Sequence, residues 1–417
     1  MDKFIINGGK RLKGEVNISG AKNATLPIMT ATLLAKGNSI LHNVPRLIDI
    51  KMMSHLLRVL GARVDFHGDV LEIDTTYVNY YEAPYELVSK MRASIYVMGP
   101  LLARFGQARV SFPGGCAIGT RPVDLHLKAM EALGAKINIE HGYIKPACKE
   151  LIGNEINFDK VSVGATANAL MTAVLAKGET NIHNAALEPE IGSLIDFLNK
   201  MGAQIEGKDT THLKITGVSK LEPAEMEMIP DRIETGTFLI AGAITKSEIT
   251  VSNCIPKHIQ VLIDRMEDAG YLFEIIGDSI KIYPPQIIKP VDIVTQPYPN
   301  FPTDLQAQFL ALMTLADGQC TVEDTIFPDR FMHVGELNRL DANILMDKNM
   351  AIINGVKSLS GAEIMATDLR ASATLVLAGL AARGQTTISR IYHIDRGYER
   401  IEEKLQKLGA NIKRVRG

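Results

Sequence analysis

The chain repeats one pattern six times along its 417 residues. In each copy an amphipathic segment ends in Gly-Ala or a close variant and continues into a β-rich segment, as in LLRVLGARVDF, KAMEALGAKINI and EKLQKLGANIKRV. The marker positions are Gly61, Gly134, Gly202, Gly270, Asp341 and Gly409, with spacings of 73, 68, 68, 71 and 68 residues. A period this constant indicates a fold assembled from six copies of one supersecondary unit.

Each marker follows a predicted helix. Glycine in this place adopts the left-handed conformation that ends many helices. Asp341 replaces glycine in the fifth copy, and aspartate tolerates that conformation better than most residues. We therefore expect a positive φ at all six markers.

A second kind of helix precedes each amphipathic one. It is apolar nearly all round, as in NATLPIMTATLLAKG, TANALMTAVLAKG and SATLVLAGLAARG, and a helix without a polar face is buried on every side. Short β-rich runs such as TNIHN and EITVSN follow these helices. Because 417 residues exceed one hydrophobic core, the six units predict two α/β domains of three units each, with helices inside and sheets outside.

Charged residues open most of the apolar helices, among them Lys22, Arg92, Asp304 and Arg370. Bases at a helix N-terminus oppose the helix dipole, so helix stability does not explain them. Solvated charges at helix starts are one interpretation. The repeat symmetry favours another, because it would gather these openings at one end of each domain, where helix N-termini bind anions.

Three arginines, Arg121, Arg330 and Arg396, occupy equivalent loops before amphipathic helices. The net charge of −2 gives no reason to expect nucleic acid as a partner. A local cluster of bases in a nearly neutral protein implies a substrate with several phosphate or carboxylate groups. No Walker loop is present and no GxGxxG opens a helix after a strand, which disfavours ATP hydrolysis and dinucleotide redox chemistry.

The four cysteines form no CxxC pair, so we expect neither structural zinc nor a disulfide framework. The sequence shows no signal-peptide core and no apolar run long enough to span a bilayer, and we expect a cytoplasmic protein. Cys116 lies in the glycine-rich segment SFPGGCAIGTR, which predicts an accessible, activated thiol, with inert packing as the alternative. We expect Cys148, Cys254 and Cys320 to be structural. In FPTDLQAQ, a helix cap is the default role of Asp304.

Nine stretches carry a resemblance to a known family: SGAKNATLP, MRAS, PGGCAIGTRPVDLH, DKVSVGAT, PDRIETGTF, FPTDLQAQF, DRFMHV, ATDLRASA and YHIDRGYERI. From end to end the chain resembles the enolpyruvyl transferase family, and within it the UDP-N-acetylglucosamine 1-carboxyvinyltransferases. The resemblance implies two inverse α/β barrels of three units each, with substrates in the cleft between them. The first barrel would span residues 21–229 and carry the cysteine loop. The second would span residues 230–417 and be completed by residues 1–20.

The resemblance also implies roles for individual residues. Cys116 is similar to a general acid that can form an adduct with phosphoenolpyruvate, and Asp304 to the base facing the sugar 3′-hydroxyl. The implied phosphate ligands are Lys22, Arg121 and Arg396, with Arg330 and Arg370 completing the basic cluster. The implied UDP-sugar contacts are Asn23, Arg92, Arg121, Pro122, Val123, Asp124, Leu125, Lys160, Val161, Ser162, Val163 and Ile326.

The implied activity is transfer of the enolpyruvyl group of phosphoenolpyruvate to UDP-N-acetylglucosamine with release of phosphate, the first committed step of peptidoglycan synthesis. It requires no metal, no cofactor and no nucleic-acid or membrane partner. Two alternatives remain. One is a sister transferase acting on shikimate 3-phosphate, against which the PGGC and DKVSVGAT segments argue. The other is a non-catalytic scaffold that binds nucleotide sugars, against which the combination of Lys22, Cys116, Asp304 and Arg396 argues.

Overall fold

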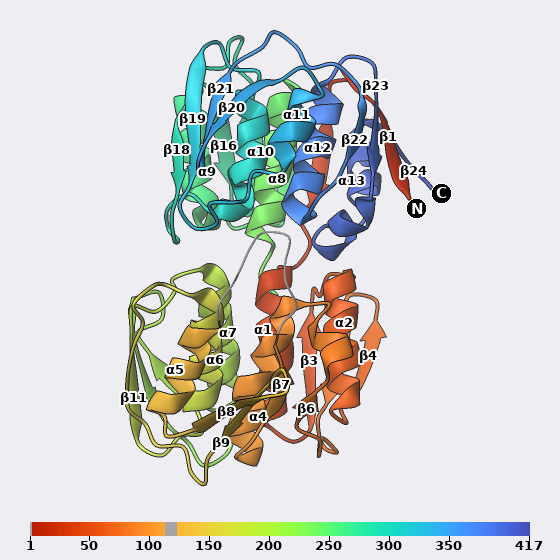
Figure 1. The fold of residues 1–417 in the computed structure, drawn as a ribbon. Helices are drawn as coiled ribbons and strands as arrows, with labels where there is room; N and C mark the ends of the chain where they lie inside the picture. Colours follow the sequence, from red (N-terminus) through yellow and green to blue (C-terminus); the bar gives the residue numbers. More distant parts are fainter. Residues whose placement is uncertain (1, 113–122) are drawn as a thin grey trace. The chain divides into compact units, whose positions relative to one another are not determined.

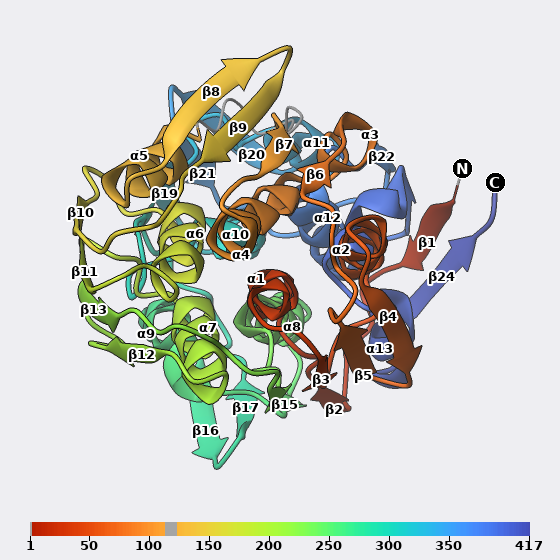
Figure 2. The same cartoon turned by 90° about the horizontal axis from the view of Figure 1, so that it is seen from below.

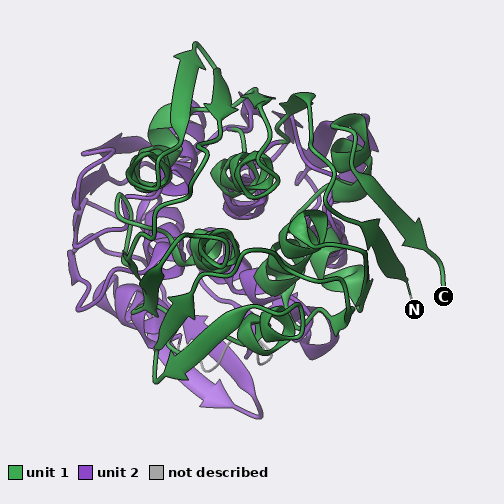
Figure 3. Cartoon of the chain, turned by 90° about the horizontal axis from the view of Figure 1, so that it is seen from above, with its two compact units in different colours: residues 1–19, 117–119, 230–417 green, residues 20–116, 120–229 purple. Residues whose placement is uncertain are grey.

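The computed structural model describes residues 2–112 and 123–417, which fall into two compact units (Figures 1 and 3). Within the described residues, unit 1 comprises 2–19 and 230–417, and unit 2 comprises 20–112 and 123–229. Cys116, Arg121 and Pro122 lie outside the described residues. No helix in the described part has the length and apolar character needed to cross a bilayer.

Unit 2 surrounds apolar helices with sheets (Figure 2). The inner helices are α1 (Lys22–Ala31), α4 (Met98–Phe105) and α6 (Val163–Ala173), with the short helices η1 (Thr32–Leu34), α3 (Tyr85–Val88) and η2 (Arg92–Val97) beside them. The amphipathic helices are α2 (Ile48–Val59), α5 (Asp124–Ala132) and α7 (Pro189–Lys200). Nine of the ten residues of α1 are buried, which agrees with its lack of a polar face.

Unit 1 follows the same plan around a core of its own. Its inner helices are α8 (Arg232–Ile244), α10 (Thr303–Met313) and α12 (Leu369–Ala381). The outer helices are η3 (Pro256–Ile259), α9 (Gln260–Asp268), α11 (His333–Asn338), η4 (Ile391–Arg396) and α13 (Ile401–Lys407). Every residue of α8 is buried.

Six four-stranded sheets cover the helices in the described chain, three in each unit. In unit 2 they run β14 (Glu225–Glu227)-β3 (Asn38–His42)-β5 (Val70–Asp74)-β4 (Arg63–His67), β6 (Glu82–Ala83)-β7 (Arg109–Ser111)-β9 (Tyr143–Ala147)-β8 (Lys136–Glu140) and β10 (Glu155–Asn157)-β11 (Glu179–His183)-β13 (His212–Thr216)-β12 (Gln204–Glu206). In unit 1 they run β2 (Gly14–Asn17)-β15 (Ile249–Ser252)-β17 (Ser279–Tyr283)-β16 (Leu272–Ile276), β18 (Ile293–Thr295)-β19 (Gln319–Asp324)-β21 (Met350–Asn354)-β20 (Asn343–Asp347) and β22 (Glu363–Met365)-β23 (Gln385–Ser389)-β1 (Lys3–Asn7)-β24 (Asn411–Val415).

Each sheet has one parallel pair followed by two antiparallel ones, and two strands are exchanged between repeats. β2 precedes α1 in sequence but pairs with β15 of the fourth repeat, with Val16 opposite Val251. β14 precedes α8 but pairs with β3 of the first repeat, with Met226 opposite Leu41. β1 completes the sheet of the last repeat between β23 and β24. The sequence period did not predict this exchange, because it specifies the order of elements and not their partners.

The marker positions have the expected backbone. Gly61, Gly134, Gly202, Gly270 and Gly409 have φ between +93° and +102°. Asp341 has φ of +66°, which lies in the left-handed region that aspartate tolerates. The predicted left-handed helix ends are therefore confirmed in all six repeats.

Helix α7 is more buried than its amphipathic pattern predicts. Nine of its twelve residues are buried, whereas α9 buries three of nine. α7 packs against both α1 and α6, so it faces the interior of unit 2 on two sides. The Gly-Ala pattern is shared by both helices, but burial depends on how many neighbours each helix meets.

Candidate active site

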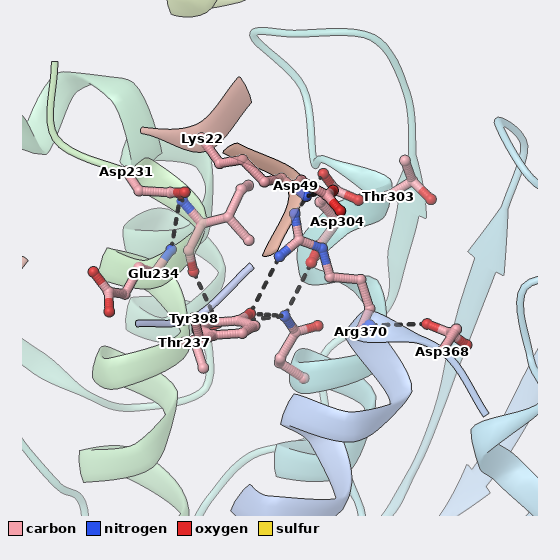
Figure 4. A network of polar contacts seen from close by, with 12 residues as sticks. Lys22, Asp49, Asp231, Glu234, Thr237, Thr303, Asp304, Asp368, Arg370 and Tyr398 are labelled. Carbon is pink, nitrogen blue, oxygen red and sulfur yellow. Dashed lines mark hydrogen bonds and ion pairs between the residues drawn. The ribbon is translucent and has the colours of Figure 1, made fainter. Parts of the chain in front are cut away.

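The opening of α10 in unit 1 holds one carboxylate between two guanidinium groups. Figure 4 shows this carboxylate, Asp304, with one of its two partners, Arg370. Asp304 is the second residue of the helix. Its Oδ1 lies 2.9 Å from Nη1 of Arg330, and its Oδ2 lies 2.9 Å from Nη2 of Arg370. The Asp304 side chain is 26% exposed, whereas each arginine side chain is 6% exposed. The N-cap of α10 is Pro302, so the default prediction that Asp304 caps this helix is wrong.

These contacts determine the charge of Asp304. Burial alone would raise its pKa, but the charges and hydrogen bonds of Arg370 and Arg330 outweigh burial and hold the pKa well below the ordinary value. The pKa of Arg370 is raised, because Asp304 and Tyr398 outweigh the effect of burial. Asp304 is therefore an anion at neutral pH whose two oxygens both accept charge-assisted hydrogen bonds.

Tyr398 supports Arg370 from the interior of unit 1 (Figure 4). Its hydroxyl accepts hydrogen bonds from Nη1 of Arg370 at 3.3 Å and from Nε2 of Gln308 at 3.2 Å. Its own proton is then available for Thr237, whose Oγ1 lies 2.9 Å away. Tyr398 is 1% exposed. Tyr398 was not predicted from the sequence, although it lies in YHIDRGYERI, one of the segments that carry the family resemblance.

Arg330 is supported by a separate set of contacts. Its Nη1 also donates to Oγ1 of Thr303 at 3.1 Å, and Thr303 donates to Asp324 at 2.6 Å. Asp324 accepts the backbone N–H groups of Ile326 at 3.0 Å and Phe327 at 2.8 Å. A single buried carboxylate thus connects the predicted sugar contact Ile326 to the residues that hold Arg330.

At the opening of helix α12, one residue caps the helix and another contacts Asp304. Asp368 is the N-cap and accepts the N–H groups of Arg370 and Ala371 at 2.8 and 3.1 Å. Because Asp368 satisfies the helix end, the Arg370 side chain can contact Asp304. Arg396, the last residue of η4, is half-buried in the same unit.

In unit 2, Lys22 is the first residue of α1 and its side chain is 10% exposed. Its Nζ lies 3.2 Å from Oδ2 of Asp49, a buried residue in the first turn of α2. The N-cap of α1, Ala21, has no side chain that could accept a hydrogen bond. Asn23 follows Lys22 and is half-buried.

His126 and Asn168 form a second polar feature of unit 2 that the sequence analysis missed. Asn168 Oδ1 accepts the N–H of Gly99 at 3.1 Å, which fixes the amide orientation. Asn168 Nδ2 therefore donates to Ile95 O at 3.1 Å and to His126 Nδ1 at 2.8 Å. Since Nδ1 accepts, the proton of neutral His126 is on Nε2. Burial, with the nearby charge of Arg92, lowers the pKa of His126 to about 4.

Of the other predicted sugar contacts that the structure describes, Arg92 is the first residue of η2, and the rest of those in unit 2 lie at the openings of α5 and α6. Ser162 is the N-cap of α6, and its Oγ accepts the N–H of Ala165 at 3.2 Å. A Cβ at Gly164 would lie 3.0 Å from Cε1 of His126, so this ring packs directly on the helix opening. Around these openings the structure places the half-buried Val161, Val163 and Leu125, the exposed Lys160 and Asp124, and the buried Val123.

The described cysteines have the environment of packing residues. Cys254 and Cys320 are 1% and 3% exposed, and burial raises the pKa of each thiol to about 11. Burial also raises the pKa of Cys148. The thiolate is the reactive form of cysteine, and the raised pKa values favour the less reactive thiol form of these three at neutral pH. Cys116, the predicted reactive thiol, lies outside the described residues.

Comparison with known proteins identifies the class. Residues 6–405 match the family described as EPSP synthase (3-phosphoshikimate 1-carboxyvinyltransferase). The chain belongs to this family of transferases.

Individual relatives narrow the likeness within the family. The chain is 55% identical over 417 residues to the UDP-N-acetylglucosamine 1-carboxyvinyltransferase of Geotalea uraniireducens, with all of both chains covered. It is 53% identical over 415 residues to the protein of that name from Desulfosudis oleivorans, again with both chains fully covered.

Solved structures agree with the fold. The enolpyruvyl transferase NikO from Streptomyces tendae superposes with a TM-score of 0.90 at 25% identity, covering 99% of each chain. EPSP synthase from Acinetobacter baumannii superposes with a TM-score of 0.77 at 17% identity over all of both chains, a likeness of fold alone. The predicted fold class, two inverse α/β barrels with buried helices and outer sheets, is confirmed.

Proposed function

We propose that the chain transfers the enolpyruvyl group of phosphoenolpyruvate to the 3′-hydroxyl of UDP-N-acetylglucosamine and releases phosphate. The observation that carries this proposal is more than 50% identity, over the full length, to relatives of that name. Asp304, which is held between Arg330 and Arg370, supports the proposal. The reaction needs a proton acceptor, and it also needs cations for a substrate with two anionic groups, a carboxylate and a phosphate.

The reaction proceeds by addition and then elimination. The sugar hydroxyl oxygen bonds to the substituted vinyl carbon while a proton is added to the methylene carbon, which gives a tetrahedral ketal. Loss of phosphate, together with a proton from the new methyl group, restores the double bond. We assign the first protonation to Cys116 and the binding of the phosphate to Lys22, Arg121 and Arg396.

The contacts of Asp304 add a condition to its proposed role as base. A carboxylate whose oxygens accept from two arginines is a weak proton acceptor, because protonation would forfeit both interactions. We propose that an anionic group of phosphoenolpyruvate draws Arg330 or Arg370 away from Asp304. Losing one cation raises the pKa of Asp304, so the base gains strength when the second substrate is present.

For the sugar nucleotide we assign Asn23, Arg92, Ile326 and the segments 121–125 and 160–163. The N-terminal opening of α6, capped by Ser162, offers backbone N–H groups suited to a diphosphate. With this assignment the reaction is the first committed step of peptidoglycan synthesis. We assign it to the cytoplasm, because both substrates are water-soluble.

Phosphate release tests the function. Purified protein is incubated with phosphoenolpyruvate and either UDP-N-acetylglucosamine, shikimate 3-phosphate or no acceptor, and the products are identified by mass spectrometry. We expect phosphate release and an enolpyruvyl product only with the nucleotide sugar. Turnover with shikimate 3-phosphate alone would establish the sister activity. Binding of the nucleotide sugar without phosphate release would establish the non-catalytic scaffold.

A further inference from the structure

Arg414, in strand β24 near the end of unit 1, donates hydrogen bonds to two carboxylates from one guanidinium group, and a third carboxylate, that of Asp2, lies 3.8 Å from its Nη1. Its Nη1 and Nη2 donate to Asp395 at 2.9 and 2.6 Å. Its Nε and Nη2 donate to Glu402 of α13 at 2.6 and 3.3 Å. The Arg414 side chain is 24% exposed and that of Glu402 is 11% exposed. All three guanidinium nitrogens are therefore engaged in a fixed, bidentate geometry.

β24 does not require these bonds to remain in its sheet. It pairs with β1 along its whole length, from Lys3 opposite Val415 to Asn7 opposite Asn411. Partly exposed ion pairs generally add little to stability. The arrangement of Arg414 is therefore better explained by what it fixes, which is Asp395.

Asp395 directly precedes Arg396 in η4, and the residues after Arg396 are held from another side. A Cβ at Gly397 would lie 2.7 Å from Cδ2 of Leu369, so the backbone here contacts the first residue of α12. The hydroxyl of Tyr398 binds Arg370, Gln308 and Thr237 (Figure 4). The backbone on both sides of Arg396 is thus tied to different elements of unit 1.

We propose that Arg414 and Asp395 are positioning residues: together they fix the backbone of η4 so that Arg396 meets the phosphate of phosphoenolpyruvate. The inference rests on the proposed function. Charge stabilisation depends steeply on the placement of the cation, because the guanidinium must lie where negative charge develops. A bidentate pair adjacent in sequence to the ligand restricts that placement more than a single hydrogen bond would.

The test measures kcat and KM for each substrate in Asp395→Asn and Arg414→Gln. We expect KM for phosphoenolpyruvate to rise roughly 10- to 100-fold, as for a small misplacement of a positioning group. KM for UDP-N-acetylglucosamine should change less than twofold. Arg414→Lys, which keeps the charge and one hydrogen bond, should recover part of the loss. Lys413→Gln, an exposed neighbour on the same strand, is the matched control and should behave like the unaltered chain.

A double-mutant cycle separates positioning from general stability. If Asp395 acts through Arg396, Asp395→Asn should have no further effect on phosphoenolpyruvate binding in an Arg396→Ala background. Additive effects, or equal rises in KM for both substrates together with a lower melting temperature, would overturn the positioning role while leaving the transferase activity intact. A chain that releases no phosphate with UDP-N-acetylglucosamine would overturn the proposed function and this inference with it.

Discussion

The two units share a scaffold but use different polar chemistry inside it. In unit 1 the opening of α10 concentrates charge, with Asp304 held between Arg330 and Arg370. In unit 2 the pair of His126 and Asn168 is neutral and locked by backbone hydrogen bonds. The buried helices of both units are apolar in every repeat. Polar residues at the helix openings can therefore differ between repeats without destabilising the hydrophobic core.

The inner helices of both units also differ in how their N-termini are capped. Ser162, Asp231 and Asp368 cap α6, α8 and α12 with their side chains. The N-caps of α1 and α10 are Ala21 and Pro302, which supply no such cap. The N-cap of the third inner helix of unit 2, α4, is Val97, which supplies none either. In α1 and α10 the first turn without a side-chain cap carries a predicted site residue, Lys22 in unit 2 and Asp304 in unit 1.

The largest effect is expected from Asp304→Asn, which tests whether the charge at the opening of α10 in unit 1 serves catalysis. We expect kcat to fall by about 10²- to 10⁴-fold, because the proton acceptor is lost, while KM for UDP-N-acetylglucosamine stays within about tenfold. Steady-state phosphate release measures both. Asp347→Asn, an exposed carboxylate of β20, serves as the control. Near-normal turnover in Asp304→Asn would mean that the charge concentrated in unit 1 serves structure alone.

The second test lowers the pH and follows the stability of each unit, because each unit buries a neutral histidine. Burial lowers the pKa of His126 to about 4, and burial also lowers that of His333 to about 4 against an opposing effect of Asp368. The unfolded chain takes up these protons first, near its pKa of 6.5. With respect to these histidines, the free energy of unfolding is therefore highest above pH 6.5. It falls by about 3 kcal/mol per histidine as the pH falls toward 4.

Hydrogen exchange between pH 7 and 4.5 can follow each unit through the amides of α6 and α10. His126→Gln should flatten the pH dependence in unit 2 only, and His333→Gln in unit 1 only. Asp304 interferes little, because its lowered pKa makes its contribution fall mainly below the unfolded aspartate pKa of about 3.9, and only the first part of that change, from about pH 5, lies in the measured range. Equal slopes in variant and unaltered chain would contradict the assignment.

A third test compares thiols. Alkylation at pH 7 should modify Cys116 at least about tenfold faster than the described cysteines, whose raised pKa values suppress the thiolate. Among those, the half-buried Cys148 of unit 2 should precede Cys254 and Cys320 of unit 1. Peptide mapping after brief labelling measures the order. Predominant labelling of Cys254 or Cys320 would count against the reactive role of Cys116.

The smallest expected effect concerns the helix markers. Asp341→Gly should stabilise unit 1 by about 0.5 kcal/mol, since glycine adopts the left-handed conformation freely but loses more entropy on folding. Gly202→Asp should destabilise unit 2 by about 1 kcal/mol, because its φ is +102° although no atom obstructs a side chain there. Urea denaturation gives both values, and a loss of stability in Asp341→Gly would show that the aspartate side chain is itself needed.

The sequence predicted what depends on local pattern. The repeat period, the buried helices and the left-handed markers follow from spacing and side-chain type. The contacts of Asp304 with Arg330 and Arg370 join residues 26 and 66 positions apart. The repeat placed Asp304 and Arg370 at equivalent helix openings, but Arg330 lies in a different kind of loop, and the family resemblance grouped it with Arg370. Tyr398, His126 and Arg414 were missed, because their roles depend on partners that no period specifies. The period also did not specify that β2 and β14 pair outside their own repeats. Only the resemblance assigned residues 1–20, which include β2, to the second barrel.

Strand β1 lies between β23 and β24, so its sheet can form only after the end of the chain has been synthesised. A ribosome adds about 5–20 residues per second, so residues 20–229 are available roughly 10–40 s before β24 emerges. Unit 2 can therefore fold while the first strand of unit 1 still lacks both neighbours. During that interval the apolar side chains of Phe4 and Ile6, fully buried in the finished protein, remain exposed on the nascent chain. Stalled ribosomes carrying residues up to about 260 should accordingly display a protease-resistant unit 2 behind a cleavable leading segment.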